Sequence, residues 1–224
     1  MTRICMTRIY CIGDIHGSYA KLKKLVVQCI NDAAGRPMRF IFLGDYIDRG
    51  PQSREAIHYL IDLQRAHPDD VICLKGNHED LALAAHDDDT WTDNWLSNGG
   101  ASTLVSYGIS SPRDLPPAHI DWLRTLPTSY QDEHRFYVHA GINPDRPLHA
   151  QDEFGLLWIR EPFLSSKAQY PRFVVHGHTP QLTGHPDVQP NRLNIDTGAV
   201  YGGPLTAAVF NDDHCGPIHL LTAR

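Results

Sequence analysis

Residues 39–51, RFIFLGDYIDRGP, constrain the fold of this chain more than any other stretch. Residues 40–43 are an apolar run with the length and composition of a buried strand. The run breaks at a glycine, and Asp45, Asp48 and Arg49 follow it closely. Such groups are poorly suited to a core, whereas the carboxyl ends of strands in open α/β sheets are where ligands bind. Taken alone, the stretch is equally typical of a solvated loop with a surface ion pair.

The same arrangement, an apolar strand followed by polar residues, recurs four more times. Predicted strands at 9–12, 71–74, 135–138 and 173–175 run into the sequences GDIHG, GNHE, HAG and HGHTP. Chance placement of so many polar groups directly after apolar strands is improbable. The repetition therefore indicates a functional site at the strand ends, a hypothesis that structural context must confirm.

Strands and helices alternate in the first half of the chain, which is the pattern of parallel βαβ units. Helices follow Ser18 and Ser53, which are predicted N-caps, and a third lies around residues 81–85. The second half is β-rich with short connections, and further strands are predicted at 156–159, 193–195, 205–210 and 218–221. We therefore predict an α/β protein in which two packed mixed β-sheets are flanked by helices.

The 224 residues of the chain are enough for one domain with a sizeable core. The regular alternation stops at residues 86–130, which hold three of the four tryptophans, several prolines and a Gly-Gly pair. A segment of that length would make a poor independent core. We predict a single domain, residues 1–224, with an insertion of short helices and loops at 86–130.

Composition excludes several classes of protein. The formal net charge of −6 argues against general nucleic-acid binding, which needs a basic face. The five cysteines form no CxxC pair, as in a reducing cytoplasm, and no apolar run approaches the length of a membrane span. We expect a cytoplasmic protein that binds neither nucleic acid nor membrane. An echo of MTRI at residues 1–4 and 6–9 leaves Met1 and Met6 as alternative starts.

The strand ends supply carboxylate, amide and imidazole groups and no thiolate. They are Asp14, His16, Asp45, Asn77, His78, His139, His176 and His178. Mixed oxygen and nitrogen ligands suit manganese, iron or zinc at a reactive centre, since structural zinc usually takes cysteine. In an extended chain, Asp14 and His16 would face the same side and hold one ion. The same spacing does not choose between His176 and His178, and most of the fourteen histidines must be ordinary surface or core residues.

Five motifs, in their order along the chain, resemble those of the phosphoprotein phosphatases among the calcineurin-like metallophosphoesterases. They are GDIHG (13–17), GDYIDRG (44–50), GNHE (76–79), HAG (139–141) and GHTP (177–180). The likeness is closest to short bacterial and phage serine/threonine phosphatases. It implies an αββα sandwich with two divalent metal ions at the strand ends, for which we expect manganese, with iron or zinc as alternatives.

The resemblance also implies a role for each site residue. One ion would be held by Asp14, His16 and Asp45, and the other by Asp45, Asn77, His139 and His178. His78 would be the general acid, oriented by Asp48, while Arg49, Arg160, Asn77 and Tyr201 would contact the substrate phosphate. His176 would pack beside the ligands or support them.

Three functions remain open. The resemblance favours a phosphomonoesterase that hydrolyses phosphoserine or phosphothreonine in proteins, with phosphotyrosine as a further substrate, by direct attack of a hydroxide held by both metals. The alternatives are a dinucleoside polyphosphate hydrolase and an inactive phosphopeptide-binding module. The acidic run at 87–89 would disfavour polyanionic nucleotides beside the site, although such runs are often only solvated. A phosphorylated protein or peptide is the expected partner.

Overall fold

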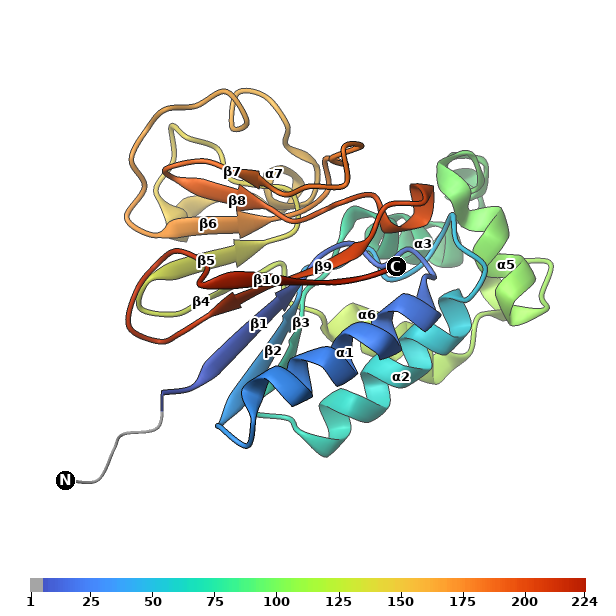
Figure 1. Ribbon diagram of the computed structural model, residues 1–224. Coiled ribbons are helices and arrows are strands. Elements are labelled where there is room, and N and C mark those ends of the chain that lie inside the picture. Colours follow the sequence, from blue (N-terminus) through green and yellow to red (C-terminus); the bar gives the residue numbers. More distant parts are fainter. Residues whose placement is uncertain (1–5) are drawn as a thin grey trace.

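Two five-stranded β-sheets packed face to face form the centre of the computed structural model, which describes residues 6–224 (Figure 1). The first sheet has the order β10-β9-β1-β2-β3 and the second the order β4-β5-β6-β8-β7. Each sheet contains both parallel and antiparallel pairs, so the predicted architecture of two mixed sheets is confirmed. Met1, Cys5 and the first copy of the MTRI echo lie outside the described residues.

The first sheet is built from strands at both ends of the chain, and the second from strands in the middle. Those of the first sheet are β1 (Arg8–Ile12), β2 (Met38–Phe42), β3 (Val71–Cys73), β9 (Leu205–Phe210) and β10 (His219–Ala223). Those of the second are β4 (Ser129–Gln131), β5 (Arg135–Val138), β6 (Phe173–His176), β7 (Asp187–Val188) and β8 (Arg192–Asn194). The chain thus starts the first sheet, builds the second, and returns to complete the first.

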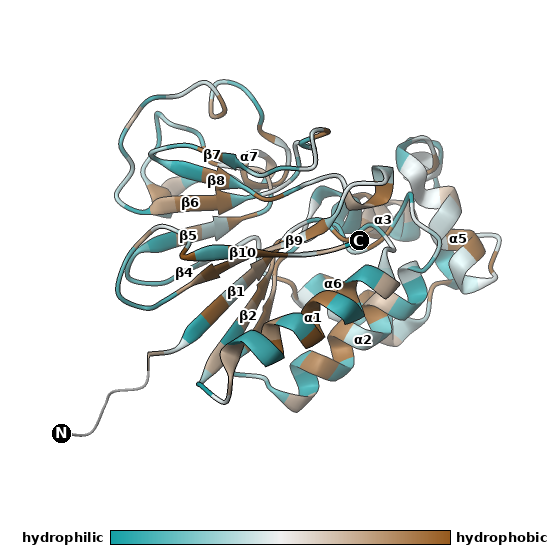
Figure 2. Ribbon diagram, viewed as in Figure 1, coloured by the Kyte–Doolittle hydropathy of each residue, from teal (hydrophilic) through white to brown (hydrophobic). Residues whose placement is uncertain are grey.

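Both faces of β1 are buried, which explains its continuous apolar sequence. Ile9 and Cys11 point into the core between the two sheets, while Tyr10 and Ile12 point into the core beneath the helices. This alternation is the two-residue period of a strand. Figure 2 shows the central strands as the most hydrophobic part of the fold.

Helices cover the outer face of the first sheet, as the helical periodicity of the sequence predicts (Figure 1). They are α1 (Tyr19–Ala33), α2 (Ser53–Ala66), α3 (Asn77–Asp87) and α6 (Pro117–Thr125). The outer face of the second sheet is covered more thinly, by the short helix α7 (Glu153–Trp158) and by loop residues such as Ile142 and Phe163. None of the helices in residues 6–224 is both long and apolar enough to cross a membrane.

Two local predictions were wrong. Residues 156–159 lie not in a strand but at the end of α7, because Asp152 caps that helix by accepting the Gly155 N–H at 2.8 Å. A short apolar run cannot by itself distinguish the two structures. Ser53 is the first residue of α2 rather than its N-cap, and its Oγ accepts the Asp48 N–H at 3.1 Å. Ser18 does precede α1, but its side chain makes no capping bond.

Residues 86–130 wrap around the carboxyl end of the first sheet. They contain α4 (Thr92–Trp95), a π-helical turn (Leu96–Gly100), α5 (Ala101–Tyr107) and α6, and β4 begins at their end. Leu115, Ile120 and Leu123 join the core formed by α1 and α2. The segment is therefore packed onto the rest of the protein through shared core residues.

Candidate active site

The polar residues that follow five different strands come together in one buried site. The loops after β1 and β2 bring His16 and Asp45, the start of α3 after β3 brings His78, and the loops after β5 and β6 bring His139 and His178. These side chains form two groups of close oxygen and nitrogen atoms: His16, Asp45 and His78, and Asp45, His139 and His178. Asp45 belongs to both groups, so its two carboxylate oxygens can serve two neighbouring ions.

The imidazoles present lone pairs to the interior of the site. His16 Nδ1 donates to the Ile47 carbonyl at 2.8 Å, and His139 Nδ1 donates to the Leu43 carbonyl at 3.0 Å. In both rings the other nitrogen, Nε2, is then the acceptor and faces the site. Burial lowers the pKa of both imidazoles, that of His16 to about 3, which keeps their lone pairs available to a cation.

Asn77 completes the second group. Its Oδ1 lies 2.8 Å from His139 Nε2 and 2.9 Å from His178 Nδ1, although it begins α3 and the histidines follow strands of the other sheet. Burial lowers the pKa of His178 to about 3. An amide oxygen, two neutral imidazoles and the Asp45 carboxylate thus converge. This donor set suits a divalent cation of the manganese, iron or zinc type.

Asp14 is buried near the site but belongs to neither group. Its carboxylate accepts the His178 backbone N–H, with Oδ2 at 3.1 Å. Burial and the negative charges of Asp196 and Asp45 raise its pKa. The chain here is not extended, as the spacing argument assumed, because the backbone turns at His16, where φ is 44°. Its role as a ligand remains a prediction.

The backbone of the site is strained. Six residues other than glycine have a positive φ within residues 6–224, and five of them lie here: His16, Asp45, Asp48, Arg49 and His178. Each such residue costs of order 1–3 kcal/mol and persists only where its surroundings hold it. Gly76 permits one of these turns, since a Cβ at this position would lie 2.4 Å from the Asp45 nitrogen.

Glu79 holds the Asp45 turn, a role that the sequence analysis did not assign. Its fully buried carboxylate accepts three backbone N–H groups, those of Asp45 at 2.8 Å, Tyr46 at 2.8 Å and Gly76 at 2.9 Å. Burial, reinforced by the Asp45 charge, raises the pKa of Glu79 to about 7. Glu79 is the last residue of the GNHE motif, and its place in that motif was the signal that could have revealed this role. A buried glutamate needs hydrogen-bond donors of this kind.

His78 and Asp48 form a buried pair. His78 Nδ1 lies 2.7 Å from Asp48 Oδ2, whereas His78 Nε2 is buried, has no hydrogen-bond partner within residues 6–224 and lies 3.9 Å from Asp45 Oδ2. Burial opposes the charged imidazole, but the carboxylates of Asp45 and Asp48 outweigh it and raise the pKa of His78. A protonated Nε2 that faces the site is the arrangement expected of a proton donor.

The site opens into a cavity of about 120 Å³. The predicted phosphate contacts Arg49, Arg160, Asn77 and Tyr201 all line it, together with Asn98, Trp158 and Pro180, which were not predicted. Arg49 Nη1 lies 2.7 Å from His16 Nε2, and its guanidinium lies over the Tyr201 ring at 5.9 Å. Two guanidinium groups beside a cation site can bind a phosphate.

His176 lies away from the cavity. Its ring packs against Phe163 with centroids 5.0 Å apart, and its Nε2 is 3.3 Å from Arg192 Nη1. It is the last residue of β6, and the chain turns after it, with φ of 64° at His178. The two histidines therefore diverge, because the chain between them is not extended.

The acidic run at 87–89 is largely neutralised. Asp87 pairs with Arg124, and Asp89 accepts a hydrogen bond from Arg113 Nε at 2.8 Å. The sequence argument that this run repels polyanionic nucleotides therefore loses most of its force.

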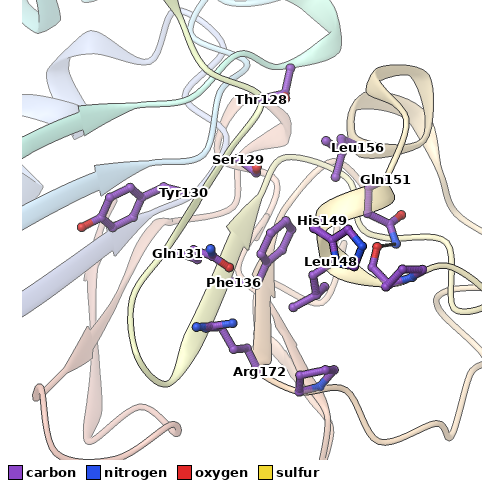
Figure 3. Close-up of a pocket in the computed structure, with 12 residues that line it drawn as sticks. Thr128, Ser129, Tyr130, Gln131, Phe136, Leu148, His149, Gln151, Leu156 and Arg172 are labelled. Atoms are coloured by element: carbon purple, nitrogen blue, oxygen red, sulfur yellow. Dashed lines mark hydrogen bonds between the residues drawn. The ribbon is translucent and has the colours of Figure 1, made fainter.

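A larger cavity of about 590 Å³ lies on another part of the surface (Figure 3). It is formed by β4, by the start of β5 and by the loops around Leu148 and Arg172. Figure 3 shows Phe136, His149 and Gln151 among its lining side chains. None of the strand-end residues described above lines it, so the smaller cavity is the candidate active site.

Comparisons with known proteins identify the family of the chain. A family model described as calcineurin-like phosphoesterase matches residues 7–211. The chain is 30% identical over 210 residues to serine/threonine-protein phosphatase 1 of Salmonella typhimurium strain LT2, covering 89% of this chain and 90% of that protein.

Solved structures with lower identity share the fold. A candidate diadenosine tetraphosphatase has a TM-score of 0.73 at 22% identity and covers 100% of this chain and 96% of its own. A cold-active protein-tyrosine phosphatase of a Shewanella species has a TM-score of 0.65 at 19% identity, covering 97% and 80%. At such identities these likenesses speak for the architecture alone.

Proposed function

Because the chain belongs to the calcineurin-like phosphoesterase family, we propose that it is a metal-dependent phosphomonoesterase acting on phosphoserine and phosphothreonine in proteins. The Salmonella relative, similar along nearly the whole length of both chains, is named a serine/threonine-protein phosphatase, which supports this substrate class. Phosphotyrosine is a further candidate substrate.

The residues present suit the dimetal centre that the family uses. His16 and Asp45, with Asp14 nearby, would hold one ion, and Asp45, Asn77, His139 and His178 the other. The absence of thiolates from this set favours manganese. When bound, two such ions activate a water for attack and neutralise phosphate charge.

The chain's own residues bind and orient the phosphoryl group. Arg49 lies over the Tyr201 ring and donates its backbone N–H to the Gly99 carbonyl, and its guanidinium offers a planar fork that matches two phosphate oxygens. Arg160 lines the same cavity from the end of α7 and is exposed to solvent, so it can close on an incoming phosphate. Phosphoryl transfer depends chiefly on such positioning and charge stabilisation.

The observation that carries the proposal is the His78–Asp48 pair. Asp48 holds Nδ1, so the buried and otherwise unpartnered Nε2 can give a proton to a departing serine or threonine oxygen. Such alkoxides are poor leaving groups and need an acid. No nucleophilic side chain is required, and hydrolysis would proceed without a phosphoenzyme.

Side-by-side turnover of a phosphoserine peptide and diadenosine tetraphosphate, with manganese present, tests the proposal. We expect kcat/KM for the peptide to exceed that for the dinucleotide by at least about tenfold, which is 1.4 kcal/mol in transition-state binding. Preferential hydrolysis of the dinucleotide would identify a dinucleoside polyphosphate hydrolase instead. Tight metal-free binding of the phosphopeptide, with no turnover after manganese is added, would identify a binding module.

A further inference from the structure

Residues 86–130 extend to the candidate active site, where Trp95 and Thr103 donate hydrogen bonds to the Asp48 carboxylate. We propose that Trp95, Gly99 and Thr103, which we call the Asp48 clamp, are positioning residues that hold Asp48 and, through it, orient His78 for proton transfer. The inference rests on the proposed role of His78 as general acid.

The clamp fixes the Asp48 carboxylate through its side chains. Thr103 Oγ1 donates to Asp48 Oδ1 at 2.6 Å, and Trp95 Nε1 donates to Asp48 Oδ2 at 2.9 Å. The third donor is His78 Nδ1 at 2.7 Å. All four side chains are at most 1% exposed. With both oxygens anchored by the clamp, the carboxylate has one orientation, and so has the imidazole that it holds.

The clamp also holds the strained backbone before Arg49. Thr103 Oγ1 accepts the Asp48 N–H at 2.9 Å, and the Gly99 carbonyl accepts the Arg49 N–H at 3.1 Å. Asp48 and Arg49 have φ of 71° and 65°, so both need such support. A Cβ on Gly99 would lie 2.7 Å from Arg49 Cγ. This close approach explains a glycine where the turn passes the arginine.

The Thr103 hydroxyl has two separate tasks, which makes it hard to replace. Its single hydrogen goes to the carboxylate and its lone pair accepts the Asp48 amide. A methyl group in its place would remove the Thr103 donor from Asp48 Oδ1 and leave the Asp48 N–H with only its longer bond to Ser53 Oγ. Asp48 could then rotate, and His78 Nε2 would no longer be held toward the leaving oxygen.

Three variants isolate this effect. Thr103→Val removes the hydroxyl and Thr103→Ser restores it. Thr125→Val is a matched control, since the Thr125 hydroxyl donates to the Trp122 carbonyl within α6, far from Asp48 in the sequence. Each is assayed with manganese on phenyl phosphate, whose phenolate is a poor leaving group, and on p-nitrophenyl phosphate, whose leaving group needs little help.

We expect Thr103→Val to lower kcat on phenyl phosphate by about tenfold or more, a part of the 10²–10⁴-fold that a general acid contributes. On p-nitrophenyl phosphate the loss should stay within about threefold. Thr103→Ser and Thr125→Val should behave like the wild type on both substrates. Equal losses of Thr103→Val on both substrates would overturn the proposal.

A double-mutant cycle shows whether the clamp acts through His78. His78→Asn should remove the acid selectively for phenyl phosphate, and adding Thr103→Val should then cost nothing more. If His78→Asn lowers kcat equally on both substrates, His78 is not the general acid, and the proposed role of the clamp is wrong as well. If His78→Asn lowers kcat selectively on phenyl phosphate but Thr103→Val does not, His78 remains the general acid and only the role of the clamp is wrong.

A measurement on the metal-free protein avoids dependence on turnover. The Nδ1 proton of His78 should give a low-field proton NMR resonance, assigned by its absence from His78→Asn. Thr103→Val should shift or broaden it, and Thr125→Val should not. Trp95→Phe, which removes the second donor, serves the same test if Thr103→Val does not fold by circular dichroism. The proposal would be overturned if the resonance were unchanged in Thr103→Val or, where that variant does not fold, in Trp95→Phe.

Discussion

Arg49 and Arg160 line the same cavity but are held very differently. Both residues are exposed, but Arg49 lies over the Tyr201 ring and donates its backbone N–H to the Gly99 carbonyl, whereas the Arg160 side chain makes no hydrogen bond within residues 6–224. We expect Arg49→Lys to lower kcat/KM on p-nitrophenyl phosphate by about tenfold or more, because a point charge cannot replace a bidentate contact. Arg160→Ala should chiefly raise KM.

Steady-state kinetics distinguish these outcomes. Arg65→Ala is a suitable control, since Arg65 lies on the exposed face of α2 and Asp62 is its only ion-pair partner in the described part of the chain. Wild-type kinetics for Arg49→Lys would contradict its assignment to the phosphate.

His176 and His178 are two residues apart and provide a matched pair of variants. His178 Nδ1 faces Asn77 in the site, and the His176 ring packs on Phe163 outside it. After purification in manganese, mass spectrometry should find about one ion fewer in His178→Ala than in the wild type. His176→Ala should retain both ions. Loss of an ion from His176→Ala alone would reverse the assignment.

At the scale of elements, Glu79 joins the start of α3 to the loop after β2. An amide in its place could keep one acceptor oxygen but would turn an NH₂ group toward a backbone N–H. We expect Glu79→Gln to lower the free energy of unfolding of the metal-free protein by about 1–3 kcal/mol, the cost of an unsatisfied buried donor. Glu133→Gln, in the β4–β5 turn, is the control for urea denaturation. Equal stability of the two variants would contradict this role.

Elements with strong local signals were predictable from sequence. The strands that bury both faces are continuous apolar runs, and the polar residues behind them mark the site. The run at 156–159 was ambiguous because Leu156 and Leu157 would be buried in a strand or a helix alike. Asp152 with Glu153 behind it was the helix-start signal that could have decided the matter.

Contacts between distant segments left no local signal. Thr103 meets Asp48 across 55 residues, and neither position has an apolar period or spacing that points to the other. The divergence of His176 and His178 depends on one φ angle after β6, which the spacing does not specify. Glu79 lay within a recognisable motif, yet its function required the position of the loop after β2.

At the scale of the molecule, the site lies across the two sheets. His16 and Asp45 follow strands of the first sheet, and His139 and His178 follow strands of the second. Bound ions should therefore hold the sheets together and stabilise the folded state by mass action, about 2.7 kcal/mol at 100 times Kd. We expect chelation to lower the Tm by several degrees and manganese to restore it.

His178→Ala controls for effects of the chelator itself. Because this variant should hold one ion fewer, chelation should lower its Tm less than that of the wild type. A wild-type Tm that is unaffected by both chelator and manganese would show that no ion links the sheets.

During synthesis, β1 is made long before β9, one of its two neighbours in the first sheet. Its antiparallel neighbour β9 pairs Ile9 with Phe210, so one edge of β1 stays open until synthesis has passed residue 210. An open edge is a template for pairing with other chains. We expect nascent chains that stall before β9 has been synthesised to leave this edge of β1 uncovered and to need a chaperone.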